Sequence, residues 1–171
     1  MIAIGCSAVD AQLPKHRNKD LTIAQFAENY NDYAHQNGMR RRLSEKGEWY
    51  IPGRQSKVPE QIEIVVSGTD NVEGWYFSTN DKQVLEKISF KTSTNTRMYI
   101  TGELQIAIRT AILSQPNADI IAADEAERAI SEMIFVTELG TKKFDFAGVI
   151  VNIDIKLLEN IYNASVDIYI P

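Results

Sequence analysis

Three charged residues near the C-terminus have the types and spacing that could support metal-dependent chemistry. An acidic residue, Asp145, is followed further along the chain by the triplet Asp154-x-Lys156. Carboxylate oxygens are the ligands that Mg²⁺ prefers, and a lysine beside a metal-bound water can assist attack on a phosphate. One hypothesis is therefore a Mg²⁺-dependent nuclease, with Asp145 and Asp154 as metal ligands and Lys156 beside the attacking water.

The same residues have a simpler structural interpretation. The pattern resembles that of nucleases with the restriction-endonuclease-like fold, which carry one acid on a strand and an acid-x-Lys on the next strand. Here Asp145 precedes what we interpret as the same strand as Asp154. The solvent face of an alternating strand also carries residues such as Asp154 and Lys156. We therefore favour an outward polar face, and we expect no enzyme activity and no bound metal.

Other catalytic or cofactor-binding patterns are missing from the sequence. The only histidines, His16 and His35, lie in polar surroundings away from acidic or cysteine residues at ligand spacing. Cys6 is the only cysteine, which excludes an intrachain disulfide and argues against a cysteine-built zinc site. Neither GxxxxGK[ST] nor GxGxxG occurs, so the standard phosphate-binding loops are absent. We expect no cofactor.

Residues 38–59, GMRRRLSEKGEWYIPGRQSKVP, form a long basic loop that glycines and prolines interrupt. A loop of this length in a compact domain is usually functional or disordered. Three interpretations stay open: the loop packs on its own domain, it contacts a neighbouring subunit, or it binds nucleic acid through basic and stacking side chains. The candidate contact residues are Arg40, Arg41, Arg42, Lys46, Trp49, Tyr50, Arg54 and Lys57.

Ordering this loop has a large entropic cost, about 1–2 kcal/mol per residue of backbone. A lone copy offers it few apolar partners. We therefore expect Arg40 to Lys57 to be mobile in the isolated chain and ordered in an assembly, with Trp49 or Tyr50 as the anchor.

Periodicity predicts a single α+β domain over residues 1–171, with an N-terminal arm at 1–19. Two main helices are predicted near 20–37 and 119–138, the first opened by the capping-box pair Thr22 and Gln25. We expect them to pack on one face of a mainly antiparallel sheet of about four to six strands.

The predicted strands follow from period-two alternation of apolar residues. A long strand is predicted from Met98 to Thr110, with Leu104, Ile106 and Ile108 on one face. It could form a hairpin with KISFKT. Its opposite face would carry Glu103, Gln105 and Arg109. FDFAGVIVNIDIKLLENI is predicted as one strand that pairs with ASVDIYI in an antiparallel hairpin.

Charge is distributed unevenly along the chain of 171 residues, whose net charge is −5. Residues 1–58 hold nine Lys/Arg against six Asp/Glu, or +3, whereas residues 59–171 hold nine against seventeen, or −8. Opposite surfaces can favour attraction between copies of one chain or toward a polyanion. No apolar run approaches the length of a membrane span, so we expect no membrane partner. The N-terminus lacks signal-peptide features and the lone cysteine suits a reducing compartment, so we expect a cytoplasmic protein.

The order of elements, carried by ELQIAIRTAI, ADEAERAISEMI, GVIVNIDIKL and ASVDIYI, resembles that of bacteriophage tail terminators. These proteins are related to minor tail protein U and to neighbouring neck and tail-completion proteins. The resemblance covers roughly residues 20–171 and assigns no site residue. It implies a virion structural protein, assembled in the host cytoplasm, that forms a homo-oligomeric ring, commonly a hexamer. Such a ring ends the tail tube, joins it to the neck, contacts tail-tube and head-completion proteins, and has no active site.

Overall fold

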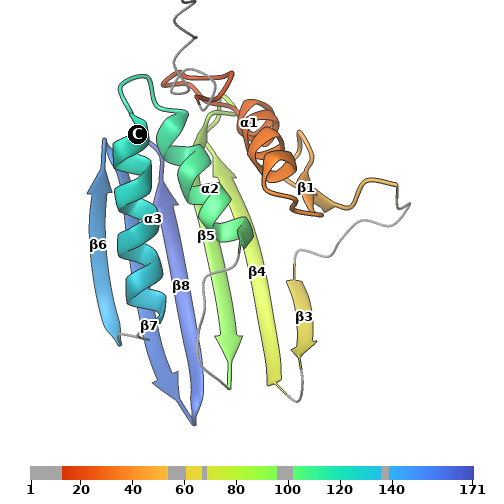
Figure 1. Cartoon of the computed structure of the whole chain (residues 1–171), viewed down its shortest axis with the longest axis vertical. Helices are drawn as coiled ribbons and strands as arrows, with labels where there is room; N and C mark the ends of the chain where they lie inside the picture. Colours follow the sequence, from red (N-terminus) through yellow and green to blue (C-terminus); the bar gives the residue numbers. More distant parts are fainter. Residues whose placement is uncertain (1–12, 54–60, 67–68, 96–101, 136–138) are drawn as a thin grey trace, which may run out of the picture.

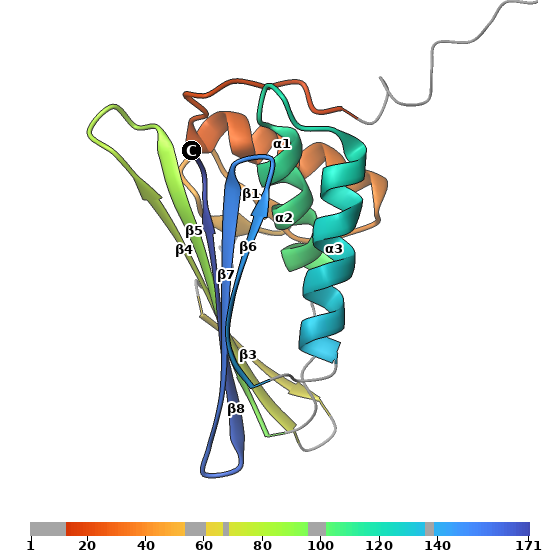
Figure 2. The ribbon, with the colours of Figure 1, turned by 90° about the vertical axis from the view of Figure 1, so that its left-hand side faces the viewer.

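The computed structural model describes residues 13–53, 61–66, 69–95, 102–135 and 139–171, with only the strand path given for 61–66 and 69–73. Three helices, α1 (Ile23–Gln36), α2 (Gly102–Leu113) and α3 (Ile120–Phe135), lie on one face of an antiparallel sheet (Figures 1 and 2). This arrangement confirms the predicted α+β class. None of the helices in these ranges is long and apolar enough to cross a membrane.

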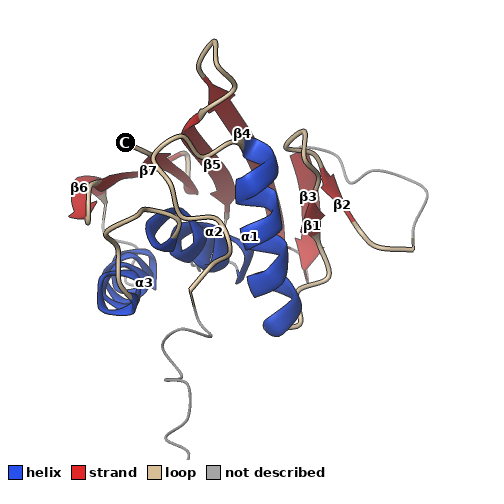
Figure 3. Ribbon diagram, turned by 90° about the horizontal axis from the view of Figure 1, so that it is seen from above, coloured by secondary structure: helices blue, strands red, loops and turns tan. Residues whose placement is uncertain are grey.

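The sheet has six strands in the order β3-β4-β5-β8-β7-β6, and every neighbouring pair is antiparallel. A separate two-stranded hairpin, β1 with β2, lies beside α1 (Figure 3). The strand bounds are β1 (Arg42–Leu43), β2 (Trp49–Tyr50), β3 (Gln61–Val66), β4 (Thr69–Thr79), β5 (Leu85–Thr94), β6 (Gly140–Phe146), β7 (Val149–Leu158) and β8 (Ile161–Tyr169).

The helices predicted near 20–37 and 119–138 are confirmed as α1 and α3. At the start of α1, the backbone N–H of Gln25 donates to the Thr22 hydroxyl oxygen, and the Thr22 N–H donates to the Gln25 side chain, both at 3.2 Å. This reciprocal pair satisfies two backbone donors that have no partner within the helix. The local sequence therefore sets where α1 begins.

The predicted strand through Leu104, Ile106 and Ile108 is wrong, because these residues form α2, a third helix. The predicted hairpin with KISFKT is also wrong, since β5 pairs with β4 and β8. α2 packs against the sheet and contacts both α1 and α3 (Figure 3). A helix covered on so many sides is apolar almost all round, so it lacks the amphipathic period that marks a surface helix. Its chance alternation over residues 103–109 then imitates a strand.

The C-terminal hairpin is confirmed, with Val151, Ile153, Val166 and Ile168 buried under the helices. Its two-residue turn, Glu159-Asn160, has positive φ at both positions, as a type I′ hairpin turn requires. The single strand predicted for FDFAGVIVNIDIKLLENI is wrong, and it also extends past the end of β7 at Leu158. It divides at Ala147-Gly148, also at positive φ, into β6 and β7.

Two asparagines on α1 fasten chain segments on either side of the helix. Asn29, fully buried, accepts from the His16 N–H at 3.0 Å and donates to the His16 carbonyl at 2.7 Å and the Ser114 hydroxyl at 2.9 Å. Asn31 makes the same two-way contact with the backbone of Leu43, both bonds at 2.8 Å. These side chains substitute for the backbone partners that a strand neighbour would provide.

The described part of the N-terminal arm, residues 13–19, lies on the body. Arg17 donates to the carbonyl oxygens of Gln115, Pro116 and Ala118 at 3.3, 3.1 and 2.6 Å, where α2 ends. A cation near the C-terminal end of a helix is favourable because the unsatisfied carbonyls there carry partial negative charge.

We predict that Asn29→Ala lowers the free energy of unfolding by about 1–3 kcal/mol, because it leaves the half-buried His16 backbone groups and the buried Ser114 hydroxyl without their Asn29 partner. Urea denaturation followed by circular dichroism measures this change. Asn117→Ala, at an exposed loop position, is the matched control and should change stability by less than about 0.5 kcal/mol. Equal stability of the two variants would contradict the assigned role of Asn29.

Candidate assembly surfaces

The basic segment after α1 divides into anchored and exposed side chains. Trp49 is only 2% exposed and belongs to the core. Its ring lies edge-on to Tyr30 and to Trp75, with centroid distances of 5.2 Å in both cases. The expectation that a lone chain offers this segment little core is therefore wrong for Trp49, and Leu43 is buried as well. The β1–β2 hairpin packs on its own domain.

Arg41 is the second anchor. Its Nε donates to the Glu103 carboxylate at 3.1 Å, with the two side chains only 11% and 18% exposed. The guanidinium also lies over the Trp49 ring, 5.6 Å from the centroid, within the range of a cation–π contact. Glu103 is in the first turn of α2, where a carboxylate is favoured by the helix dipole. This ion pair therefore ties the basic segment to the central helix.

The remaining basic and aromatic residues that were predicted as contact candidates differ in how far their side chains are exposed to solvent. Arg42 is half-buried and its guanidinium donates to the carbonyls of Met39 and Arg41. Arg40, Lys46 and Tyr50 are exposed. Arg54 and Lys57 lie outside the described residues. Among the described candidates, the exposed side chains are therefore two cations and one tyrosine, and buried neighbours hold the backbone that carries them.

The nuclease candidates do not converge. Asp145 is on β6, the strand next to Asp154 and Lys156 on β7, so the required strand order does occur. However, Asp154 is opposite Thr141, four residues from Asp145 along β6. At about 3.3 Å per residue, that separation is about 13 Å, too far for two ligands of one metal ion.

Asp154 instead contacts its own neighbours. Lys156 Nζ lies 2.7 Å from one carboxylate oxygen and the Thr141 hydroxyl donates to the other at 2.9 Å. The hydrogen bond from Lys156, and then that from Thr141, lower the pKa of Asp154 below its ordinary value. Across the described ranges, no cluster of three or more His, Cys, Asp or Glu residues is placed to hold a metal ion.

Where its side chains are described, the face of the sheet opposite the helices is mainly polar. This face carries Asn152, Asp154 and Lys156, as predicted. These residues alternate along β7 with buried apolar residues, and so do their register partners along β8. Glu103, Gln105 and Arg109 belong to α2 instead. A groove of about 320 Å³ crosses β4, β5 and β8 on this face, and is lined by Tyr76, Ser78, Lys87, Ser89, Lys91, Ser165 and Asp167.

The groove residues are not among the predicted site residues. The alternation of polar with apolar residues along β5 and β8 is the sequence signal that indicates a polar face there. Asp167 accepts from the Ser89 hydroxyl and lies 3.8 Å from Lys87 Nζ. Lys87 is also 5.6 Å from the Tyr169 ring centroid, and Lys91 is 5.8 Å from that of Tyr76. The groove therefore pairs cations with tyrosines and one carboxylate, an arrangement suited to a polar surface contact.

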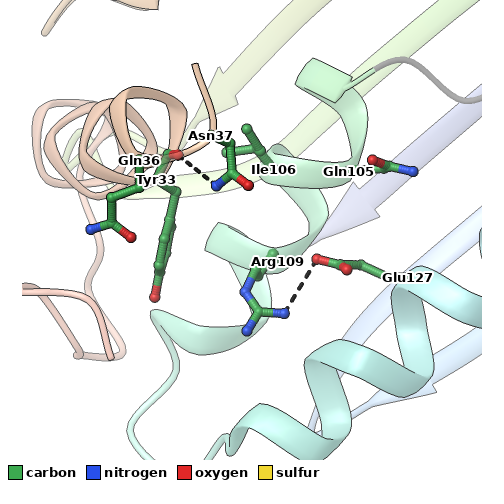
Figure 4. Close-up of a pocket in the computed structure, with 7 residues that line it drawn as sticks. All are labelled: Tyr33, Gln36, Asn37, Gln105, Ile106, Arg109 and Glu127. Atoms are coloured by element: carbon green, nitrogen blue, oxygen red, sulfur yellow. Dashed lines mark hydrogen bonds and ion pairs between the residues drawn. The ribbon is translucent and has the colours of Figure 1, made fainter. Parts of the chain in front are cut away.

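A second hollow, of about 310 Å³, lies among the three helices (Figure 4). Arg109 points from α2 toward α3, where its Nη1 donates to Asp124 at 2.8 Å and to Glu127 at 3.4 Å. Burial raises the pKa of Glu127, and the nearby Arg109 opposes that shift. Because Arg109 already faces two carboxylates, its evident role is to hold α2 against α3. The hollow is lined by Tyr33, Gln36, Asn37, Gln105, Ile106, Arg109 and Glu127.

We predict that the Arg41–Glu103 pair contributes to stability through burial. Glu103→Gln leaves a nearly buried guanidinium without its counter-charge, so the free energy of unfolding should fall by about 1–3 kcal/mol. Glu86→Gln removes an exposed carboxylate and should be near neutral. Urea denaturation at pH 7 compares the two variants. A Glu103→Gln protein as stable as the Glu86→Gln protein would show that the pair is not structural.

The raised pKa of Glu127 predicts a pH effect of definite sign. The Glu127 carboxylate takes up its proton at a higher pH in the folded protein than in the unfolded chain, where the pKa of a glutamate is 4.5. The contribution of Glu127 to the free energy of unfolding should therefore rise as pH falls from the native pKa toward 4.5. NMR titration of the side-chain carboxyls measures the pKa, and Glu127→Gln should abolish that contribution. A native pKa of Glu127 at or below 4.5 would refute the assignment.

Comparisons with protein-family models, with curated proteins and with solved structures found no match. The functional argument therefore depends on the surfaces of this chain itself.

Proposed function

We propose that the chain is a structural subunit of a phage or phage-like particle, resembling a tail terminator. In this proposal, copies form a homo-oligomeric ring at the end of the tail tube and join the tube to the neck. The partners are then further copies of the chain, the tail-tube protein and a neck or head-completion protein. The protein would be assembled in the host cytoplasm and would reside in the virion.

The observation that supports this proposal best is the one-sided covering of the sheet. All three helices lie on one face of the sheet (Figure 2). On the opposite face, the described side chains of β4, β5, β7 and β8 include the polar groove and the row Asn152, Asp154 and Lys156. A ring subunit needs two different flanks for its two neighbours and a further surface toward the tube or the neck. The open sheet face, with its groove, is suited to be that further surface.

The tip of the β7–β8 hairpin offers a second contact of the same kind. The hairpin extends beyond the end of α3 (Figure 2), and Leu157, Leu158 and Ile161 at its tip are exposed. Clustered apolar side chains on a projecting element usually mark a protein contact. A tip of this shape can reach a neighbouring component of a particle.

The two alternatives have weaker support. For nucleic-acid binding, burial of Trp49 removes the best stacking side chain and Glu103 already pairs with Arg41. Among the described residues of the segment, Arg40 and Lys46 are the exposed cations that are left for phosphate contacts. For the nuclease, Asp145 and Asp154 are held apart by the sheet register.

We predict that the purified chain assembles, with a molar mass in light scattering that is a multiple of 19.3 kDa, and six copies if the ring is a hexamer. Negative-stain electron microscopy should show closed rings. The Leu157→Ser, Leu158→Ser variant should form the same rings, because we assign the hairpin tip to a contact outside the ring. A chain that stays at 19.3 kDa up to its solubility limit would overturn the proposal.

A further inference from the structure

The two ends of the sheet carry different surfaces. α3 lies over the β6–β7 end, whereas α1 and the β1–β2 hairpin lie at the β3–β4 end (Figures 1 and 3). A head-to-tail ring places one such end of each copy against the other end of the next copy. These ends are therefore the surfaces to compare for complementarity.

The outer surface of α3 is an acidic stripe, which we define as Ile121, Asp124, Glu125, Arg128 and Glu132. All five side chains are exposed. Positions 121, 125, 128 and 132 follow the spacing that aligns residues along one side of a helix. Ile121 is 68% exposed, the largest value among the exposed large apolar residues. The stripe thus combines one apolar side chain with three carboxylates and one cation.

The opposite end carries what we call the basic flank, Arg40, Lys46 and Tyr50. Tyr50, on β2, is 36% exposed. Arg40, which precedes β1, and Lys46, in the turn between β1 and β2, are exposed as well. Buried neighbours hold the flank in place, because Asn31 binds Leu43, Trp49 packs in the core and Arg41 pairs with Glu103. A preorganised surface loses little entropy on binding.

We propose that the basic flank of one copy binds the acidic stripe of the next copy. This inference rests on the proposed ring and names the surfaces that close it. Arg40 and Lys46 would face carboxylates of the stripe, and Tyr50 would cover Ile121, as an aromatic anchor at the centre of a contact.

A second copy is the partner that the observations favour. The chain itself carries both complementary surfaces, on opposite ends of the sheet. Each copy can therefore bind one neighbour through its basic flank and another through its acidic stripe. A charge of the minor sign accompanies each surface: Arg128 is part of the stripe, and the exposed Glu45 lies next to Lys46 in the sequence, beside the flank. This mixture of charges favours one alignment of the two surfaces as well as attraction between them, because like charges that meet across an interface weaken it.

Charge reversal tests the pairing directly. One variant carries Glu125→Lys and Glu132→Lys on the stripe, and a second carries Arg40→Glu and Lys46→Glu on the flank. A third variant combines all four changes. All four residues are exposed, so each variant should keep the wild-type circular dichroism spectrum and melting behaviour. The matched control, Lys82→Glu with Glu86→Lys, reverses two exposed charges in the β4–β5 region that belong to neither of the two defined surfaces.

We expect the stripe and flank variants each to raise the concentration needed for half-assembly at least about tenfold, measured by light scattering at about 0.1 M salt. The four-change variant and the control should assemble like the wild type. An equimolar mixture of the stripe and flank variants should also assemble, because the basic stripe of one then meets the acidic flank of the other.

The outcomes separate this inference from the proposed function. If the wild type forms rings and both reversed variants assemble equally well, the ring stands and the named surfaces are wrong. If both variants fail and the four-change variant also fails, the loss does not come from charge pairing and the inference is overturned. A wild type that remains monomeric overturns the ring and this contact together.

Discussion

The structure depends on the burial of α2. Leu104, Ile108 and Ile112 are fully buried, and the helix is apolar on almost every side, so it must be covered by the sheet and by helices on both flanks. α1 and α3 provide that cover, and all three helices consequently lie on one face. The opposite face of the sheet has no helix left to cover it. Its polar groove is thus a consequence of how the central helix is buried.

Ion pairs fasten both ends of the molecule to that same helix. Near its start, Glu103 holds Arg41 and with it the basic flank. One turn and a half further on, Arg109 reaches Asp124 and Glu127 of α3, which carries the acidic stripe. Charge-assisted bonds in partly buried surroundings are stronger and more directional than exposed ones. The two surfaces proposed to meet in a ring are therefore held in a fixed relation within each copy.

Local features could be predicted from the sequence, and long-range ones could not. The capping pair Thr22 and Gln25 fixes the start of α1 within four residues, and the alternation of β7 and β8 shows the hairpin directly. The helix at Leu104 could not be predicted, because it is buried on several sides and its apolar residues therefore do not repeat with the 3.6-residue period of an amphipathic helix. The position of Trp49 depends on Tyr30 and Trp75, which are distant in sequence. The separation of Asp145 from Asp154 depends on a sheet register that no residue type encodes.

β6 is an edge strand of the sheet, and its side chains determine whether another strand can pair with it. A free sheet edge invites pairing with another strand, which would lead to open-ended growth. Lys142 is opposite Ile153, a buried residue, so it lies on the helix-facing side of β6, and it is exposed there beside Lys143. Charged residues on an edge strand, above all one on its inner side, oppose strand addition. The charges on β6 are therefore consistent with the proposed ring, in which copies meet through side chains of their flanks and not through pairing at this edge.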